Sequence, residues 1–402
     1  MRLLLITSTN LTSNPRLVKE MRLALSIGYD VTVVLFDLKQ WTKSLEQTYQ
    51  KEFKEVKFIY LSITRNSFNW LQTTLVHFFA KKLNSSYPLS LKLSAFASDK
   101  RSFLLTKKLK KLSHKKFDLI ISHNLGALYP AFQYANKHNI PFAFDVEDYH
   151  PGEVIPADAE GEKMRREFLM QQMLPQAEFI TAASPLIANQ VGKLCQCTVT
   201  TINNSFYSSE FKLSLLDDAV EDKIKLVWFS QHINHGRGLE LLLPALDMFN
   251  DIVGLTLIGN LNQDFGDSWL KGRGYVGVIA PLPQNELHEE LSKYDAGLAL
   301  ELKSVDFNRD IALTNKIFAY KQAGLFILAT DTQAQSEFMN QYKEDGYVCE
   351  QTIESLKAGV DYIIQNISAI RAGKNNRFNA AIKIGFETEA QKLVALWQDV
   401  LK

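Results

Sequence analysis

A cationic residue flanked by two glycines stands where a buried-strand pattern gives way to a helical one. Gly236, Arg237 and Gly238 lie between the apolar runs "IKLVWFS" and "LELLLPAL". A helix start presents free N–H groups and the positive end of the helix dipole, and a guanidinium donates two hydrogen bonds in a fork. Together these groups suit a diphosphate. The plainer alternative is a surface Arg in a glycine turn.

A second candidate set opens the helical stretch "TNKIFAYKQAG". Thr314 or Asn315 is expected to cap this helix, and Lys316 follows in its first turn. A Lys at that position opposes the helix dipole. We therefore expect either an anionic group beside Lys316 or a side chain exposed to solvent.

Acidic and histidine side chains gather after two predicted strands. His123 ends "FDLIISH", and the strand "IPFAFDV" runs into "EDYHPGE", which supplies Glu147, Asp148 and His150. Strand exits commonly carry functional groups. We predict that the side chains of the second stretch bind acceptor hydroxyls or orient a base, and His123 is a further candidate; the alternatives are an acidic loop cap and a structural histidine.

The elements that must position these groups follow an alternating pattern. "RLLLIT", "NPRLVKEMRLALSIG" and "YDVTVVLF" predict a strand, a helix capped by Asn14 with Pro15 at its first position, and a second strand. The alternation stops over the polar stretch "SFYSSEFKLSLLDDAVEDK" and resumes at "IKLVWFS". Such alternation predicts parallel sheets covered on both faces. The fold class is therefore α/β, with two Rossmann-like doubly wound domains.

The same pattern predicts the domain limits. We place an N-terminal domain over residues 1–205 and a C-terminal domain over 206–384, and expect a C-terminal helix over about 385–402 to pack back on the first.

Ligands of open parallel sheets bind beyond the carboxyl ends of the strands, which in two such domains would face a cleft. This rule adds Gln231, Gly259 and Glu301 to the candidate binding residues, because they stand at or near the ends of three predicted strands.

Composition excludes several classes of protein. The chain has 402 residues, 46% of them apolar, and a formal net charge of +1, which indicates a globular protein without a nucleic-acid partner. Its three cysteines lack partners at metal-ligand spacing, and no D-x-D pair follows a predicted strand. The first loop, "STNLTSNPRL", lacks the glycines of a dinucleotide fingerprint. We therefore expect no metal and no cofactor.

Localisation is read from apolar and basic segments. The start "MRLLLITSTN" lacks the features of a signal peptide, and no apolar run approaches about 18 residues, so a cytoplasmic location is expected. Residues of about 66–116 mix Trp, Phe and Leu with clustered lysines, which suits peripheral contact with the inner face of the plasma membrane. An ordinary exposed helix is the alternative.

Four stretches, taken together, resemble a known family. They are "SNPRLVKEMRLALSIGYDVTVV", "FDLIISHNLGALYPAFQYANKHNIPFAFDVEDYH", "IKLVWFSQHINHGRGLELLLPAL" and "APLPQNELHEELSKYDAGLALELKSVDFNRDIALTNKIFAYKQAGLFILATD". Their order and spacing resemble the glycosyltransferases of the GT-B fold, in particular the retaining enzymes of family 4. The resemblance spans essentially the whole chain.

The resemblance implies specific site residues. In the family an Arg and then a Lys usually hold the donor diphosphate, and these positions look like Gln231 and Arg237, so one cation is missing. Two family glutamates, the second of which contacts the donor ribose, look like Ile311 and Ala319 here. We expect Glu301 or the start of the helix that carries Ala319 to replace them.

Three functions are compatible with this reading. We favour a hexosyltransferase, retaining by resemblance, that moves a sugar from a nucleotide-sugar donor in the second domain to a glycan or lipid-linked acceptor on the first, in cell-surface polysaccharide synthesis. A sugar-nucleotide epimerase of the same architecture and a non-catalytic relative that lost the donor-site glutamates are the alternatives.

Overall fold

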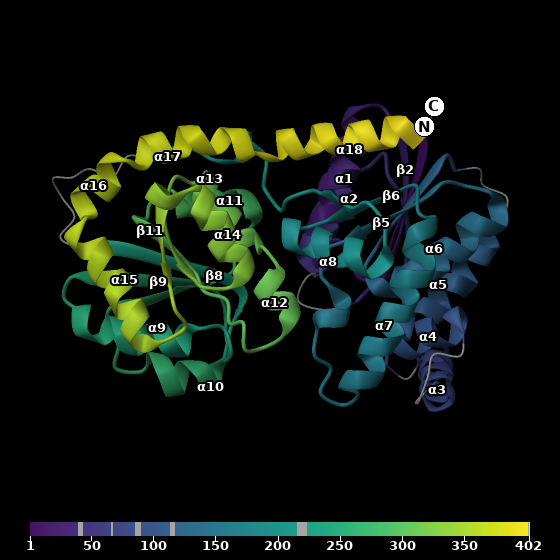
Figure 1. Cartoon of the computed structure of the whole chain (residues 1–402), viewed down its shortest axis with the longest axis horizontal. Coiled ribbons are helices and arrows are strands. Elements are labelled where there is room, and N and C mark those ends of the chain that lie inside the picture. Colours follow the sequence, from purple (N-terminus) through teal and green to yellow (C-terminus); the bar gives the residue numbers. More distant parts are fainter. Residues whose placement is uncertain (39–42, 66, 85–89, 113–116, 215–222, 401) are drawn as a thin grey trace. The chain divides into compact units, whose positions relative to one another are not determined.

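The chain folds into two compact units (Figure 1). The computed structural model describes residues 1–38, 43–65, 67–84, 90–112, 117–214, 223–400 and 402. The first unit comprises Met1–Ile202 and Lys392–Lys402, and the second comprises Asn203–Gln391. The division thus falls three residues before the predicted boundary at 205, and the second unit extends beyond residue 384. Residues 215–222 of the predicted polar linker lie outside the described part of the chain.

The first unit is built on a parallel sheet. Within the described residues its strands are β1 (Arg2–Thr7), β2 (Asp30–Asp37), β3 (Lys57–Ser62), β4 (Leu119–His123), β5 (Phe142–Val146), β6 (Phe179–Ala182) and β7 (Thr200–Thr201). They lie in the order β3-β2-β1-β4-β5-β6-β7, with every neighbouring pair parallel. This is the doubly wound order, in which the chain changes direction across the sheet between β1 and β4.

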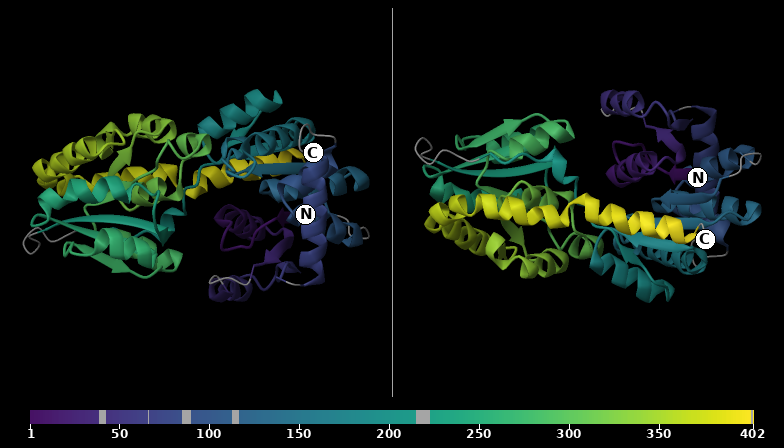
Figure 2. Two further views of the ribbon diagram at one scale, coloured as in Figure 1. Left: turned by 90° about the horizontal axis from the view of Figure 1, so that it is seen from below. Right: turned by 90° about the horizontal axis from the view of Figure 1, so that it is seen from above.

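Helices lie on both faces of this sheet (Figure 2). They are α1 (Pro15–Ser26), α2 (Lys43–Glu52), α3 (Phe68–Leu83), α4 (Leu91–Ser98), α5 (Arg101–Leu109), α6 (Leu125–His138), α7 (Ala159–Met173) and α8 (Pro185–Cys195). The strands between them read as continuous apolar runs because both faces are covered, and Leu3, Leu4 and Leu5 of β1 are fully buried. The predicted start of α1 is confirmed: the Asn14 side chain accepts a hydrogen bond from the N–H of Leu17, with Pro15 at the first helical position.

The second unit repeats the arrangement. Among the described residues its strands are β8 (Ile224–Ile233), β9 (Val253–Leu261), β10 (Val276–Ile279), β11 (Ala296–Ala299), β12 (Phe326–Thr330) and β13 (Gly346–Cys349), in the order β10-β9-β8-β11-β12-β13. All neighbouring pairs are parallel. Its α-helices are α9 (Leu239–Leu246), α10 (Gln263–Phe265), α11 (Gln284–Leu291), α12 (Phe307–Ile311), α13 (Asn315–Gln322), α14 (Gln333–Gln341), α15 (Ile353–Gln365), α16 (Ile367–Ala372) and α17 (Lys374–Ala381). The switch point of this sheet lies between β8 and β11.

The last helix, α18 (Phe386–Val400), begins in the second unit and ends in the first. Its Trp397 is fully buried and contacts the ring of Tyr29 at a centroid distance of 6.0 Å. Lys392 Nζ donates to the carbonyl oxygen of Thr201 at 3.5 Å. The prediction that the C-terminal helix packs back on the first domain is confirmed.

Candidate functional site

The glycine turn after β8 lies at the switch point of the second sheet. Gly236 and Gly238 have φ values of +71° and +81°, a region that glycine enters without strain. A Cβ atom on Gly238 would lie 3.1 Å from the Cβ of Leu300. The turn is therefore packed directly against the segment that follows β11.

Arg237 is the free cation of this turn. It is half-buried, and it makes no hydrogen bond or ion pair with any residue that the structure describes. The backbone of Gly236 is engaged, because its N–H donates to Glu240 Oε1 at 2.6 Å and its carbonyl accepts from Arg309 Nη1 at 3.3 Å. The expectation of a free helix-start N–H is thus wrong for Gly236, and the guanidinium is what remains for an anion.

Lys316 has an anionic neighbour from within the protein. Its Nζ lies 2.7 Å from Glu301 Oε1, and both side chains are buried. The ammonium also lies 5.9 Å from the centroid of the Trp228 ring. Of the two expectations for Lys316, an anionic partner is correct and solvent exposure is wrong.

The start of α13 is not capped as predicted. Thr314 occupies the N-cap position, but its side chain makes no capping hydrogen bond. Asn315 lies one position later, and its Oδ1 is buried without a hydrogen-bond partner among the described residues. Ser, Thr, Asn and Asp normally satisfy an N–H of the first turn. The polar groups of Thr314 and Asn315 are therefore uncommitted to the helix end.

The positions that resemble the two family glutamates face the interior. Ile311 and Ala319 are both fully buried. Gln231, which takes the place of the family Arg, is exposed on β8. The structure thus brings Arg237, Glu301 and Lys316 to the carboxyl ends of β8 and β11, with Gln231 on the outer part of β8.

Gly259 holds the adjoining strands in close contact. Its φ is +156°, and a Cβ atom there would overlap the carbonyl oxygen of Ser230 on β8.

We expect Gly259→Ala to lower the free energy of unfolding by roughly 2–3 kcal/mol, since an L side chain is strained in this conformation and the strand must move. Thermal unfolding measures the effect. Gly254→Ala is the matched control on the same strand, because a Cβ atom at Gly254 meets nothing within 4 Å; equal stability of the two variants would contradict the prediction.

His123 is held between two carboxylates in the first unit. It is buried at the end of β4, with Nε2 3.2 Å from Glu20 Oε2 and Nδ1 3.4 Å from Asp145 Oδ2. Burial alone would lower the pKa of His123, but Glu20 and Asp145 outweigh it and raise the pKa to about 10. The two carboxylates therefore favour the protonated form of the imidazole.

Asp145 forms the second ion pair of this cluster. Arg16 donates to both of its carboxylate oxygens, from Nε at 2.7 Å and from Nη2 at 2.6 Å, and the Thr181 hydroxyl donates at 2.5 Å. Burial opposes the charged form, but Arg16 outweighs burial and holds the pKa of Asp145 far below its usual range. Arg16 and Asp145 are fully committed to each other and to the protein interior.

The loop after β5 supplies two half-buried carboxylates and a buried histidine. Glu147 and Asp148 are half-buried, and burial together with the neighbouring Asp148 raises the pKa of Glu147 to about 7. His150 is buried, with Nδ1 3.4 Å from a carboxylate oxygen of Glu153, and its Nε2 has no hydrogen-bond partner in the described part of the chain. Burial would lower the pKa of His150, but Glu153 raises it. A pKa of about 7 means that the protonation of Glu147 changes near neutral pH.

The raised pKa of Glu147 predicts how stability depends on pH. The folded state disfavours the ionised form, so stability is lost as the pH rises from the unfolded pKa of 4.5 through about 7. Glu147→Gln is expected to remove that loss and to raise the Tm above that of the natural protein at pH 8, with little change at pH 4. Calorimetric scans across this range test it, and a Gln variant with an unchanged pH profile would contradict it.

Two residues that contact the candidate site of the first unit were not predicted from the sequence. Asn124 follows β4 with φ +65° and ψ 147°, and its Oδ1 accepts a hydrogen bond from the Thr7 hydroxyl of β1 at 2.6 Å. Glu20, on α1, faces His123 across the interior. Both contacts join segments more than 100 residues apart, so no local signal announces them. Glu240, by contrast, stands only four residues after Gly236, so its contact with that turn could have been predicted from the sequence.

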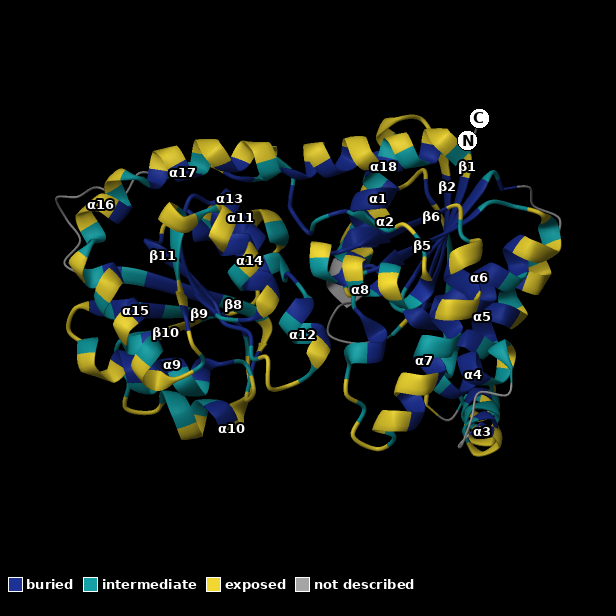
Figure 3. Ribbon diagram, in the orientation of Figure 1, coloured by how far each residue is buried: buried dark blue, intermediate teal, exposed yellow. Residues whose placement is uncertain are grey.

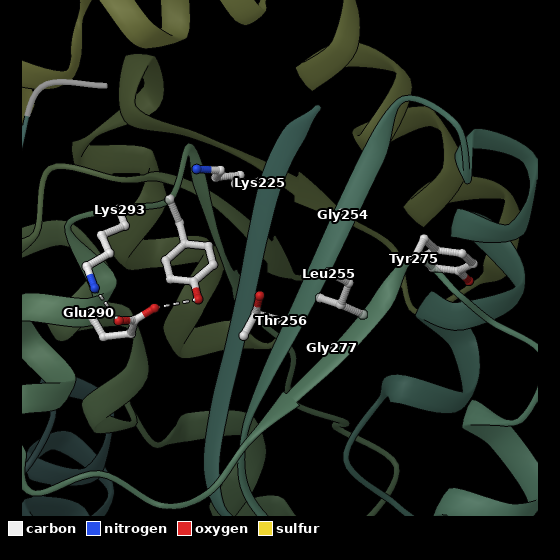
Figure 4. Close-up of a pocket in the computed structure, with 9 residues that line it drawn as sticks. Lys225, Gly254, Leu255, Thr256, Tyr275, Gly277, Glu290 and Lys293 are labelled. Atoms are coloured by element: carbon white, nitrogen blue, oxygen red, sulfur yellow. Dashed lines mark hydrogen bonds and ion pairs between the residues drawn. The ribbon is translucent and has the colours of Figure 1, made fainter. Parts of the chain in front are cut away.

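A separate hollow of about 270 Å³ lies in the second unit (Figure 4). Its lining includes Lys225 and Gly254, each the second residue of its strand, so it lies toward the amino ends of β8 and β9, away from Arg237. Lys293 and Tyr294 both bond to Glu290, at 2.7 and 2.9 Å. Its polar groups are thus partly satisfied within the protein. In the residues that the structure describes, no three His, Cys, Asp or Glu side chains are arranged to hold a metal ion.

No family model and no curated protein sequence matches the chain. Solved structures match nearly all of it. HepE from Anabaena in complex with UDP-glucose shares 12% identity, covers 99% of this chain and 100% of that chain, and gives a TM-score of 0.69. Sucrose-phosphate synthase from Thermosynechococcus elongatus shares 13%, covers 100% and 99%, and gives 0.64.

A structure from Listeria monocytogenes assigned as a UDP-N-acetylglucosamine 2-epimerase shares 13% identity, covers 100% of this chain and 96% of that chain, and gives a TM-score of 0.60. Identities this low establish architecture alone, and the resemblance to family 4 stays a prediction. Two doubly wound parallel sheets matched over the full chain by these structures establish that the protein has the two-domain GT-B fold.

Proposed function

We propose that the protein is a glycosyltransferase that moves a sugar from a nucleotide-sugar donor to a glycan or lipid-linked acceptor. The observation that carries the proposal is the guanidinium of Arg237, which has no partner among the described residues and lies at the switch point where parallel sheets bind ligands. HepE, which shares the fold, holds UDP-glucose in its structure. That complex supports a donor of the same class.

The donor-side groups suggest a division of labour. Arg237 would donate to the diphosphate and stabilise the negative charge that develops on it as the sugar leaves. Lys316 is already balanced by Glu301, so its net attraction for the diphosphate is smaller. Glu301, although its Oε1 pairs with Lys316, and the uncommitted oxygens of Thr314 and Asn315 are suited to donor hydroxyls, in place of the family glutamates.

In this proposal the loop after β5 binds the acceptor. Glu147, Asp148 and His150 would bind acceptor hydroxyls, and His123 would position this loop through Asp145 rather than touch the sugar. Transfer would proceed without a metal ion or cofactor. We extend the proposal to a retaining hexosyltransferase of cell-surface polysaccharide synthesis at the cytoplasmic face of the plasma membrane, which rests on the family resemblance.

Calorimetric titration with UDP-, GDP-, ADP- and TDP-sugars tests the donor site. Saturable binding of one nucleotide class supports the proposal and identifies the base. The bound donor is then incubated with and without sugar acceptors. Conversion of the donor alone to an epimer would favour the epimerase, an alternative that the Listeria structure keeps in view. Absence of binding at millimolar concentration would favour the non-catalytic relative.

A further inference from the structure

Helix α3 of the first unit places its apolar side chains outward. Six of its apolar residues are between 48% and 69% exposed, namely Phe68, Leu71, Leu75, Phe78, Phe79 and Leu83. They recur every three or four residues, apart from the adjacent pair of Phe residues, and so form one stripe along the helix. The fully or nearly fully buried residues are the small Thr73 and Ala80. This is the reverse of a helix in a water-soluble domain, where the large apolar side chains face the core.

Basic side chains accompany the stripe. Helix α3 packs against α5, and Lys107 of α5 donates to Gln72 of α3 at 3.3 Å. On α3, on α5 and in the turn directly after α5, the exposed or half-exposed lysines are Lys81, which pairs with Glu162, and Lys82, Lys107, Lys108, Lys110 and Lys111. Asp99 is the one acidic residue in the sequence between residues 67 and 112, and it receives a hydrogen bond from the N–H of Arg101. The surface is therefore apolar and positively charged at once.

We infer that α3 docks onto the surface of an anionic lipid bilayer, with the apolar stripe buried at the level of the headgroups and the lysines beside lipid phosphates. Large apolar side chains exposed in this number cost free energy in water, and burial at a bilayer removes that cost. The lysines add attraction to anionic headgroups. A second copy of the chain would bury the apolar stripe as well, but would bring two sets of lysines together. Figure 3 shows exposed residues on α3.

The predicted membrane segment of 66–116 is thereby narrowed to one helix and the lysines next to it. Residues 66, 85–89 and 113–116 of that segment lie outside the described part of the chain. Among the described residues, no helix combines the length and apolar content that crossing a bilayer requires. The contact inferred here is peripheral.

Ion pairs fix the docking helix to the candidate acceptor loop. Lys81, near the end of α3, lies 3.4 Å from Glu162 of α7. From the same helix, Arg166 pairs with Glu153 at 2.7 Å and donates to the carbonyl oxygen of His150 at 2.6 Å. A docked first unit therefore holds the loop after β5 at a fixed distance from the lipid surface, as a lipid-linked acceptor would require.

Vesicle flotation of the full chain tests the inference. The natural protein is expected to float with vesicles of phosphatidylcholine and phosphatidylglycerol, to bind phosphatidylcholine vesicles weakly, and to bind less in high salt. The variant Leu75→Ser/Phe78→Ser/Phe79→Ser is expected to lose binding by about tenfold or more, since each side chain forfeits its burial in the interface. Its Tm should not fall, because these side chains are exposed.

Met248→Ser/Ile382→Ser is the matched control, because both residues are as exposed as the stripe but belong to the second unit. Equal binding by the stripe variant and this control, or no binding of the natural protein to anionic vesicles, would overturn the inference. A natural protein that instead dimerises through α3, with the stripe variant monomeric, would do the same. Nucleotide-sugar titrations of all three proteins are expected to agree, so failure of the docking surface and failure of the donor site are told apart.

Discussion

Replacing Arg237 with Ala is expected to weaken binding of the nucleotide-sugar donor by about 10- to 100-fold without lowering the Tm. Hydrogen bonds to charged groups contribute roughly 1.5–3 kcal/mol, and each 1.4 kcal/mol corresponds to tenfold in affinity. Because Arg237 has no partner among the described residues, its removal leaves no buried group unpaired. Calorimetric titration with the sugar nucleotide that binds the natural protein measures the change.

Two further variants sharpen this result. Arg237→Lys keeps the charge but loses the fork, so an intermediate affinity is expected. Lys316→Ala should differ in kind, because it leaves Glu301 buried without its cation and so lowers the Tm as well as the affinity. Undiminished affinity of a folded Arg237→Ala would remove the donor site from this turn.

Replacing Asp145 with Asn is expected to destabilise the first unit by roughly 3–5 kcal/mol, a fall in Tm on the order of 10 °C. The substitution keeps the shape of the side chain but leaves the Arg16 guanidinium buried without its bidentate carboxylate. It also takes from His123 one of the two carboxylates that raise its pKa. Differential scanning calorimetry at pH 7 measures the loss.

The pH dependence follows from the direction of the Asp145 pKa. A lowered folded-state pKa gives stability that is present above the unfolded value of 3.8 and is lost as the pH falls through the folded pKa. The difference between the natural protein and Asp145→Asn should therefore narrow in acid. The double variant Arg16→Met/Asp145→Leu is the informative comparison, because removing both charges should cost less than removing the carboxylate alone. Additive losses would show that the pair is not an interacting unit.

The architecture could be predicted because its signals are local. Apolar strand runs and helical spacing are read within a few residues, and Asn14 and Pro15 announce the start of α1 in the same way. The predicted boundary at residue 205 lies three residues after the end of the first segment of the first unit. The chain re-enters the first unit at Lys392, later than the predicted position of about 385, because α18 continues unbroken from one unit into the other. The apolar spacing of a helix does not change where the helix passes from one unit into another, so the sequence pattern does not indicate that point.

The site could be predicted only as positions, and its partners could not. The rule for parallel sheets pointed to the strand ends that carry Arg237, Glu301 and His123. Whether a charge there is free or already matched depends on contacts across the fold, such as that of Glu20 with His123. The same holds for Lys316, whose partner Glu301 belongs to a neighbouring strand exit. The sequence therefore predicted where the charged side chains lie, but not that Arg237 is the cation without a partner among the described residues.

The strained turn at Asn124 has a consequence for the order of folding. Its backbone conformation is one that a non-glycine residue adopts only at a cost of order 1–3 kcal/mol, so the turn is not stable by itself. What holds it are hydrogen bonds that its Oδ1 accepts from Thr7 and Thr9, 117 and 115 residues earlier in the chain. The turn is therefore expected to form only after β1 and β4 have paired, late on the path to the native state. Contacts made that late leave the folding rate unchanged and set the rate of unfolding, so this one side chain contributes to the kinetic lifetime of the first unit.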